Sequence, residues 1–80
     1  MLVFPNPVKD NMTIQVRSLS SENIDYKVYD ISGKIIYAGS WIKDQGINNF
    51  DLNLRNLELG LYILELRDSN GSSRFKFVKD

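Results

Sequence analysis

The side chains in this sequence that could do chemistry are carboxylates, lysines, arginines and tyrosines, because the 80 residues contain no histidine and no cysteine. The missing histidine removes the usual general base near neutral pH, and the missing cysteine removes thiolate nucleophiles and disulfides. Both absences also remove the commonest ligands of transition metals. No pair of carboxylates is spaced as in a glycosidase cleft. We therefore predict that the chain is not an enzyme and that it binds no metal or cofactor.

The charge of the chain is balanced, with ten lysines and arginines against ten aspartates and glutamates. A neutral domain lacks the basic surface that binds nucleic acid or anionic lipid. No apolar stretch approaches the ~20 residues of a membrane-spanning helix. The first four residues run into Pro5 without an apolar leader region. We predict no nucleic-acid partner and no membrane insertion, and we expect the chain to be a module from the end of a larger protein.

The elements that must position these side chains are strands, because apolar and polar residues alternate in short runs such as Met12, Ile14 and Val16. This period of two is typical of antiparallel strands with one buried face. Short strands with turns between them indicate a β-sandwich or a barrel. Leucines near 54–61 have helix-like spacing, but Gly60 interrupts it, so we expect at most one helical turn near 54–59. The expected strands are 2–4, 11–17, 24–30, 34–42, 47–54, 61–67 and 73–79.

Two tight turns share the pattern Asp-x-x-Gly, with Asp30 and Gly33 in one and Asp68 and Gly71 in the other. An aspartate at the first position can accept backbone N–H bonds, and the glycine can adopt a positive φ. Lys34 follows the first turn directly. The carboxylates there are too sparse for the six to eight oxygen ligands of calcium. We interpret both segments as hairpin turns, and residues 43–46 as a third turn.

Pro5-Asn6-Pro7 opens the chain with two residues that cannot donate a backbone hydrogen bond, so the segment cannot lie in a central strand. It can be a linker or an edge crossover, or it can mark a boundary for recognition or processing. The segment Gly60-Leu61-Tyr62 resembles the tyrosine corner of Greek-key sandwiches, in which a buried tyrosine bonds to the backbone upstream. That resemblance favours a sandwich over a barrel.

Residues 75–79 form an apolar and basic terminal strand. It can be an edge strand protected by charge, with Phe75 and Phe77 buried and Lys76 and Lys79 displayed outward. It can also be a tag that a receptor reads, including by adding a strand to its edge. Both interpretations remain open from the residues alone.

The aromatic residues offer a further interpretation, a small carbohydrate-binding sandwich that uses Trp41, Tyr29 or Tyr37. Sandwich cores often contain a tryptophan, so we favour a core or half-buried rim position for Trp41. We expect Tyr29 to be the exposed aromatic, because Tyr26 and Val28 alternate with it toward the inside.

Taken together, these segments resemble the type A C-terminal sorting domain of the type IX (Por) secretion system. The resemblance runs from Phe4 to Lys79, and its parts are Pro5-Asn6-Pro7 with Val8, the Asp30-x-x-Gly33-Lys34 turn, the Leu57-x-x-Gly60-x-Tyr62 segment, and the terminal strand with Lys76 and Lys79. Asp80 departs from the family pattern, in which members often end on or beside the basic residue.

The resemblance implies an all-β fold: an immunoglobulin-like antiparallel sandwich of about seven short strands with Greek-key connections. It implies a single sorting domain over residues 1–80, in which 1–8 form an opening segment or linker end and 9–80 form the sandwich. Exposed edges would also allow an edge-strand dimer.

The resemblance further implies a C-terminal signal on a larger cargo protein, with the cargo domain preceding it. Such cargo passes through the periplasm to the cell surface or the medium. The implied partners are the translocon and shuttle proteins of the type IX system, and a surface sortase that removes the domain by a cut near the opening segment. The competing interpretation is a generic immunoglobulin- or fibronectin-like spacer or adhesion module.

The motif residues fall into two groups under this resemblance. We expect most of them to act through the fold, and these are Pro5, Asn6, Pro7, Asp30, Gly33, Lys34, Gly60 and Tyr62. The candidates for direct recognition by the secretion machinery lie in the terminal strand, and these are Lys76, Phe77, Val78 and Lys79.

Overall fold

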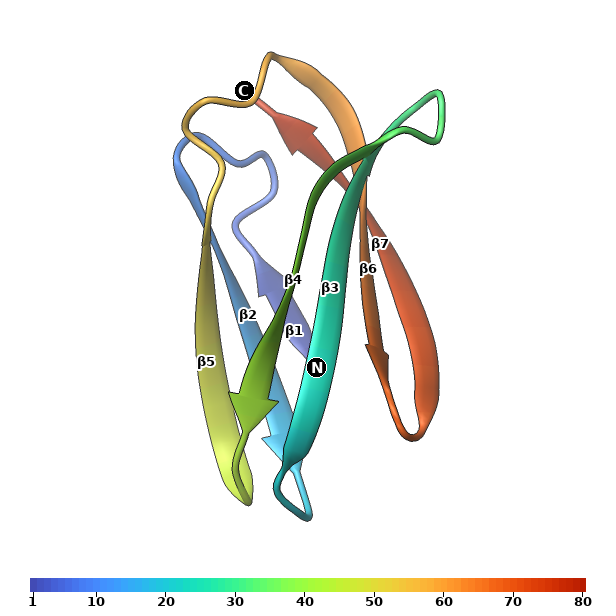
Figure 1. Ribbon diagram of the computed structural model, residues 1–80. Coiled ribbons are helices and arrows are strands. Elements are labelled where there is room, and N and C mark those ends of the chain that lie inside the picture. Colours follow the sequence, from blue (N-terminus) through green and yellow to red (C-terminus); the bar gives the residue numbers. More distant parts are fainter.

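The computed structural model describes all 80 residues as seven strands without a helix (Figure 1). Every expected strand is present, and each boundary agrees with the expected one within two residues. The strands are β1 (Leu2–Phe4), β2 (Asn11–Ser18), β3 (Glu22–Asp30), β4 (Ile35–Lys43), β5 (Gly46–Asn53), β6 (Gly60–Asp68) and β7 (Gly71–Lys79).

Two antiparallel sheets face each other as a sandwich. One has the order β1-β2-β5 and the other the order β4-β3-β6-β7 (Figure 1). Hairpins join β3 to β4 and β6 to β7, whereas the connections from β2 to β3, from β4 to β5 and from β5 to β6 cross between the sheets. Neighbours such as β2 and β5 are thus distant in sequence, which is the Greek-key arrangement of immunoglobulin-like folds. The predicted fold class is confirmed.

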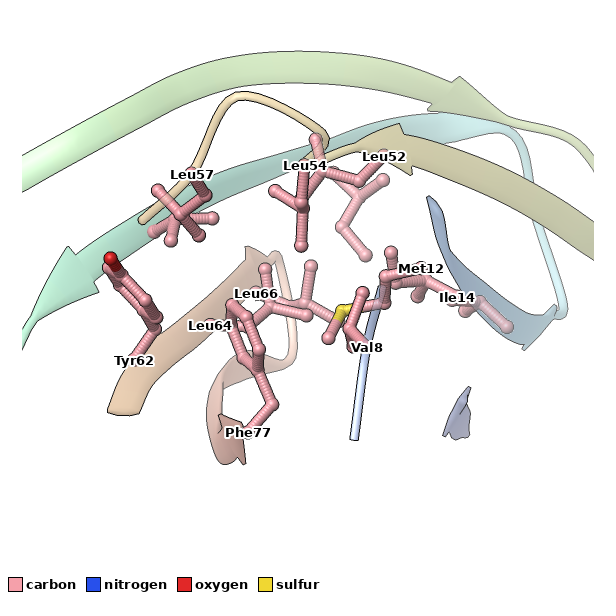
Figure 2. Close-up of a cluster of buried hydrophobic side chains, with 13 residues drawn as sticks. Val8, Met12, Ile14, Leu52, Leu54, Leu57, Tyr62, Leu64, Leu66 and Phe77 are labelled. Atoms are coloured by element: carbon pink, nitrogen blue, oxygen red, sulfur yellow. The ribbon is translucent and has the colours of Figure 1, made fainter. Parts of the chain in front are cut away.

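The core forms where the inner faces of the two sheets meet, because alternate side chains of each strand point inward. Figure 2 shows Met12 and Ile14 of β2 in one cluster with Leu64 and Leu66 of β6 and with Phe77. Thirteen hydrophobic residues are buried in it, and these are Val8, Met12, Ile14, Val16, Ile24, Val28, Leu52, Leu54, Leu57, Tyr62, Leu64, Leu66 and Phe77.

Trp41 is half-buried at the rim of this core, which is one of the two positions favoured for it. Its ring stacks between those of Tyr26 and Phe50, with centroids 4.2 and 4.7 Å away. Gly39 lies opposite Tyr26, and a side chain there would collide with the tyrosine ring. The aromatic stack therefore closes one side of the sandwich.

The leucine-rich segment after β5 makes a single turn, in which the Leu57 N–H donates to the carbonyl of Leu54 at 3.0 Å. Leu54 and Leu57 are buried, whereas Leu61 is exposed on β6. The segment with helix-like leucine spacing is thus a loop, and its buried leucines cover one end of the core. The structure contains no helix that could cross a membrane.

An ion cluster closes the opposite end of the sandwich. Lys43 is buried, and its Nζ lies 2.6 Å from Asp68 Oδ2 and 3.6 Å from Glu22 Oε1. Burial alone would lower the pKa of Lys43, but the bonds to Asp68 and Glu22 outweigh it and raise that pKa. The hydrogen bond from Lys43 lowers the pKa of Asp68 despite desolvation. The cluster is therefore stable in its charged form.

We expect Lys43→Met to lower the free energy of unfolding by about 2 kcal/mol at pH 7, because the substitution leaves Asp68 without its cation. The depressed pKa of Asp68 means that its contribution is complete above the ordinary value of 3.8 and is lost as pH falls through the folded-state pKa. Urea unfolding between pH 7 and pH 2.5 should show a steeper loss for the wild type than for Lys43→Met. Lys27→Met, at an exposed lysine of β3, is the matched control. Equal pH profiles of wild type and Lys43→Met would contradict the prediction.

Candidate functional site

The four motif segments meet at one end of the sandwich, the upper end in Figure 1, where the C-terminus lies. Lys79 pairs with Gly60 on one side and forms a parallel bridge with Val8 on the other. Tyr62 pairs with Phe77 across β6 and β7 and with Asp30 across β3 and β6. Segments that are about 70 residues apart in the chain thus lie side by side at this end.

The opening segment, Pro5–Val8, is bonded to the terminal strand. The Val8 N–H donates to the Val78 carbonyl and the Asp80 N–H to the Val8 carbonyl, each at 2.8 Å, and the Val78 N–H donates to Asn6 Oδ1 at 3.0 Å. The two prolines have no donor to offer, so Asn6 and Val8 make these contacts. The segment connects β1 and β2 of the three-stranded sheet and at the same time lies against the edge of the four-stranded one.

The division expected at residue 8 is not visible in the structure. β1 pairs with β2 from Leu2 to Phe4, and Val8 is fully buried among the core side chains (Figure 2). Val8 lies outside the strands, so the alternation of apolar and polar residues could not predict that it belongs to the core. Residues 2–8 are therefore part of the sandwich and not a linker to it.

The Asp30 turn is a folding device, as expected. Asp30 Oδ1 accepts bonds from the backbone N–H groups of Ser32 at 2.9 Å and Lys34 at 3.0 Å, and Gly33 adopts a φ of 89°. The bond from the Ser32 hydroxyl, followed by that from the Lys34 backbone, lowers the pKa of Asp30. The carboxylate is therefore already occupied within its own turn.

The tyrosine corner is also confirmed. The Tyr62 hydroxyl donates to the Glu58 carbonyl at 2.7 Å, and Gly60 adopts a φ of 148° at the bend. Burial raises the pKa of Tyr62, with a smaller contribution from the Glu58 charge. Tyr62 also stacks on Phe77 at 5.7 Å between centroids. Tyr62 thus connects the loop before β6, through its hydroxyl, with the terminal strand, through its ring.

The terminal strand does not display both of its lysines. Lys76 and Val78 are exposed, whereas Phe77 is fully buried and Lys79 is only 6% exposed. The expectation for Lys79 was wrong because residues three apart on a strand lie on opposite faces. Lys79 forms no ion pair and no side-chain hydrogen bond. Since every buried side-chain nitrogen and oxygen has a hydrogen-bond partner, the Lys79 ammonium is not one of the buried atoms. Its aliphatic stem is covered and its charged end reaches solvent. Phe75 is half-buried and not fully buried.

Tyr29, expected to be the exposed aromatic, is half-buried instead. Its hydroxyl donates to Glu65 at 3.4 Å, and the Arg74 guanidinium lies 5.8 Å from the centre of its ring. Arg74 in turn bonds to Glu65 at 2.8 Å. These neighbours come from the other two strands, β6 and β7, and cover the ring, so the residue pattern of β3 alone cannot predict its burial.

A groove that the sequence motifs do not predict lies on the outer face of the four-stranded sheet. A hollow of about 250 Å³ is lined by Ile31, Leu61, Tyr62, Ile63 and Lys76. A second hollow of about 240 Å³ shares Ile31 and Ile63 with the first and reaches Arg74. The only sequence signal for this site is an isoleucine at position 31, where a hairpin turn usually has a polar residue.

A family of known proteins accounts for this arrangement. The family model described as "Secretion system C-terminal sorting domain" matches residues 2–80. The chain belongs to this family. The sorting domain is thus a C-terminal signal of type IX secretion, which directs export to the cell surface or the extracellular space, and the family is not a catalytic one.

One curated relative is an endo-acting ulvan lyase of Formosa agariphila, which is 27% identical over 77 residues. The alignment covers 92% of the sorting domain but only 13% of the length of that relative. No solved structure matches the sorting domain.

Proposed function

We propose that this sorting domain is carried at the end of a larger cargo protein and guides that cargo through the periplasm to the type IX translocon. The family match over residues 2–80 carries the proposal. The match to a small part of a much longer relative supports a cargo that precedes the domain. After transfer across the outer membrane, a surface sortase removes the domain.

Lys76 and Val78 are the residues of the terminal strand that the machinery contacts. They share the outer face of β7, at the edge of the four-stranded sheet. Phe77 and Lys79 act through the fold, because their side chains point inward beside Tyr62 and Gly60. Asn6 acts by holding Val78 in place.

The sortase cut lies before β1. Leu2–Phe4 are paired with β2, and Asn6 and Val8 are bonded to the terminal segment, so only the exposed Pro5 and Pro7 lack such contacts, and each lies between held neighbours. A protease that needs several consecutive extended and accessible residues has no such stretch between Leu2 and Val8. A cut before Leu2 releases the sandwich intact.

The test is a fusion of residues 1–80 to the end of a reporter that has its own inner-membrane signal peptide. In a bacterium with a working type IX system, we expect the reporter at the cell surface or in the medium, and the same fusion should stay in the periplasm of a translocon-deficient strain. The reporter without the chain is the control. Periplasmic retention in both strains would favour a spacer or adhesion module and refute the proposal.

A further inference from the structure

The outer face of the four-stranded sheet has an apolar groove next to the terminal strand. Ile31 belongs to the β3–β4 turn, is 77% exposed and lines both hollows. Ile63 of β6 lines both hollows. We refer to Ile31, Leu61, Ile63 and Lys76 as the Ile31 groove.

Large apolar side chains gather around the Ile31 groove. Leu61 is 53% exposed and lies directly opposite Val78, which is 39% exposed, and Ile63 lies opposite Lys76. Leu59, just before β6, is exposed as well. Soluble domains rarely expose contiguous apolar surface unless a partner covers it. The patch is therefore a candidate interface.

The charge beside the groove favours an acidic partner. Lys76 is exposed, lines the first hollow and has no ion pair, whereas Arg74 at the second hollow is already bonded to Glu65. The Asp30 carboxylate lines the second hollow, where the N–H groups of its own turn hold it, and it forms no ion pair with Lys76. Lys76 is thus the charged group at the first hollow that no partner within the domain engages.

The size of the groove favours a protein segment over a small molecule. Each hollow, at about 250 and 240 Å³, lies below the ~300–1,000 Å³ of typical ligand pockets. A hollow of this size fits one or two apolar side chains, which is how extended segments anchor on a partner surface.

We propose that the Ile31 groove binds an extended segment of a protein of the export route, with one apolar side chain in each hollow and a carboxylate on Lys76. This inference rests on the proposed function, because it names the surface by which the sorting domain is recognised. The groove also places the Asp30 turn at the interface, since that turn holds Ile31 over β6.

The first experiment compares reporter export for Ile31→Ser and Leu61→Ser with that for Ile47→Ser. Ile47 is a matched control because it is 60% exposed and belongs to β5, in the other sheet. We expect surface or extracellular reporter to fall at least tenfold for the groove variants and to stay at the wild-type level for Ile47→Ser. Thermal unfolding of the purified chains should show that Ile31→Ser, at the more exposed position, keeps the wild-type midpoint.

The second experiment tests the charge, with Lys76→Glu expected to lose export at least tenfold and Lys76→Arg expected to keep it. A third arm adds the free sorting domain to the periplasm, where it should compete with the wild-type fusion, whereas free Ile31→Ser should not.

Wild-type export of the Ile31 and Leu61 variants would overturn the groove and leave the proposed function intact. Failure of the unaltered fusion would refute the proposed function itself. A concentration-dependent dimer of the purified chain that Ile31→Ser abolishes, measured by analytical ultracentrifugation, would assign the groove to a second copy and overturn the inference.

Discussion

Phe77→Ala is expected to remove a large share of the folding stability of the chain. Phe77 is fully buried, pairs with Tyr62 and stacks on its ring, so its removal opens a cavity where β6 and β7 meet the core. Buried Phe→Ala substitutions cost about 3–5 kcal/mol. An 80-residue domain has a total stability of roughly 4–12 kcal/mol, so the loss is a large fraction of it. Circular dichroism should record a midpoint lower by about 15–30 °C.

Val78→Ala is the matched control for Phe77→Ala, because it removes an apolar side chain at the next position of the same strand. Val78 points to the outer face and is partly exposed, so the expected loss is under about 1 kcal/mol. An unchanged midpoint for Phe77→Ala would mean that the terminal strand is not part of the core.

This expectation affects how the sorting signal is tested. Deleting 75–79 removes Phe77 and the partner of β6 along with the exposed Lys76 and Val78. Loss of export by such a deletion would follow from unfolding as much as from loss of recognition. Substitutions at exposed positions, with stability measured in parallel, separate the two causes.

The features predicted from the sequence are those whose causes are local. The alternation of apolar and polar residues predicts the strands. Asp30 and Gly33 predict the hairpin turn that contains them, and the spacing of Gly60 and Tyr62 predicts the tyrosine corner. Each depends on residues within about five positions of one another, so the chain alone contains the necessary information.

The features that were missed depend on contacts between distant segments. Val8 is buried because it lies against Val78, which is 70 residues away, and Tyr29 is covered by side chains from β6 and β7. The groove exists because the β3–β4 turn holds Ile31 beside Ile63. Lys79 is a different case. It lies two residues after the buried Phe77 on the same strand, so alternation along the strand predicts that its side chain points inward. The expectation of an exposed Lys79 followed the family motif instead.

Removing residues 1–8 is expected to abolish cooperative folding. The truncation exposes the site of Val8, whose burial contributes about 1.5–3 kcal/mol, and it breaks the backbone bonds of Val8 to Val78 and Asp80, each contributing about 1 kcal/mol. It also deletes β1 from the edge of its sheet. Urea unfolding of residues 9–80 should therefore show no cooperative transition, whereas the complete chain should show one.

Two single substitutions divide this effect between the core and the surface. Val8→Ala should lower the free energy of unfolding by about 2 kcal/mol, and Leu2→Ser, at an exposed position of β1, by less than about 1 kcal/mol. A truncated chain as stable as the complete one would restore the boundary at residue 8 and would permit a sortase cut within Pro5-Asn6-Pro7.

The outcome for residues 9–80 also bears on the proposed sortase cleavage. A cut within Pro5-Asn6-Pro7 would leave β1 on the cargo and release a chain that lacks part of its sheet. A cut before Leu2 would release a piece that keeps Asn6 and Val8 bonded to Val78. The released fragment should therefore begin at or before Leu2 and unfold with the same urea midpoint as the complete chain. Mass spectrometry of the fragment gives the cut, and a fragment that starts after Leu2 would contradict the placement.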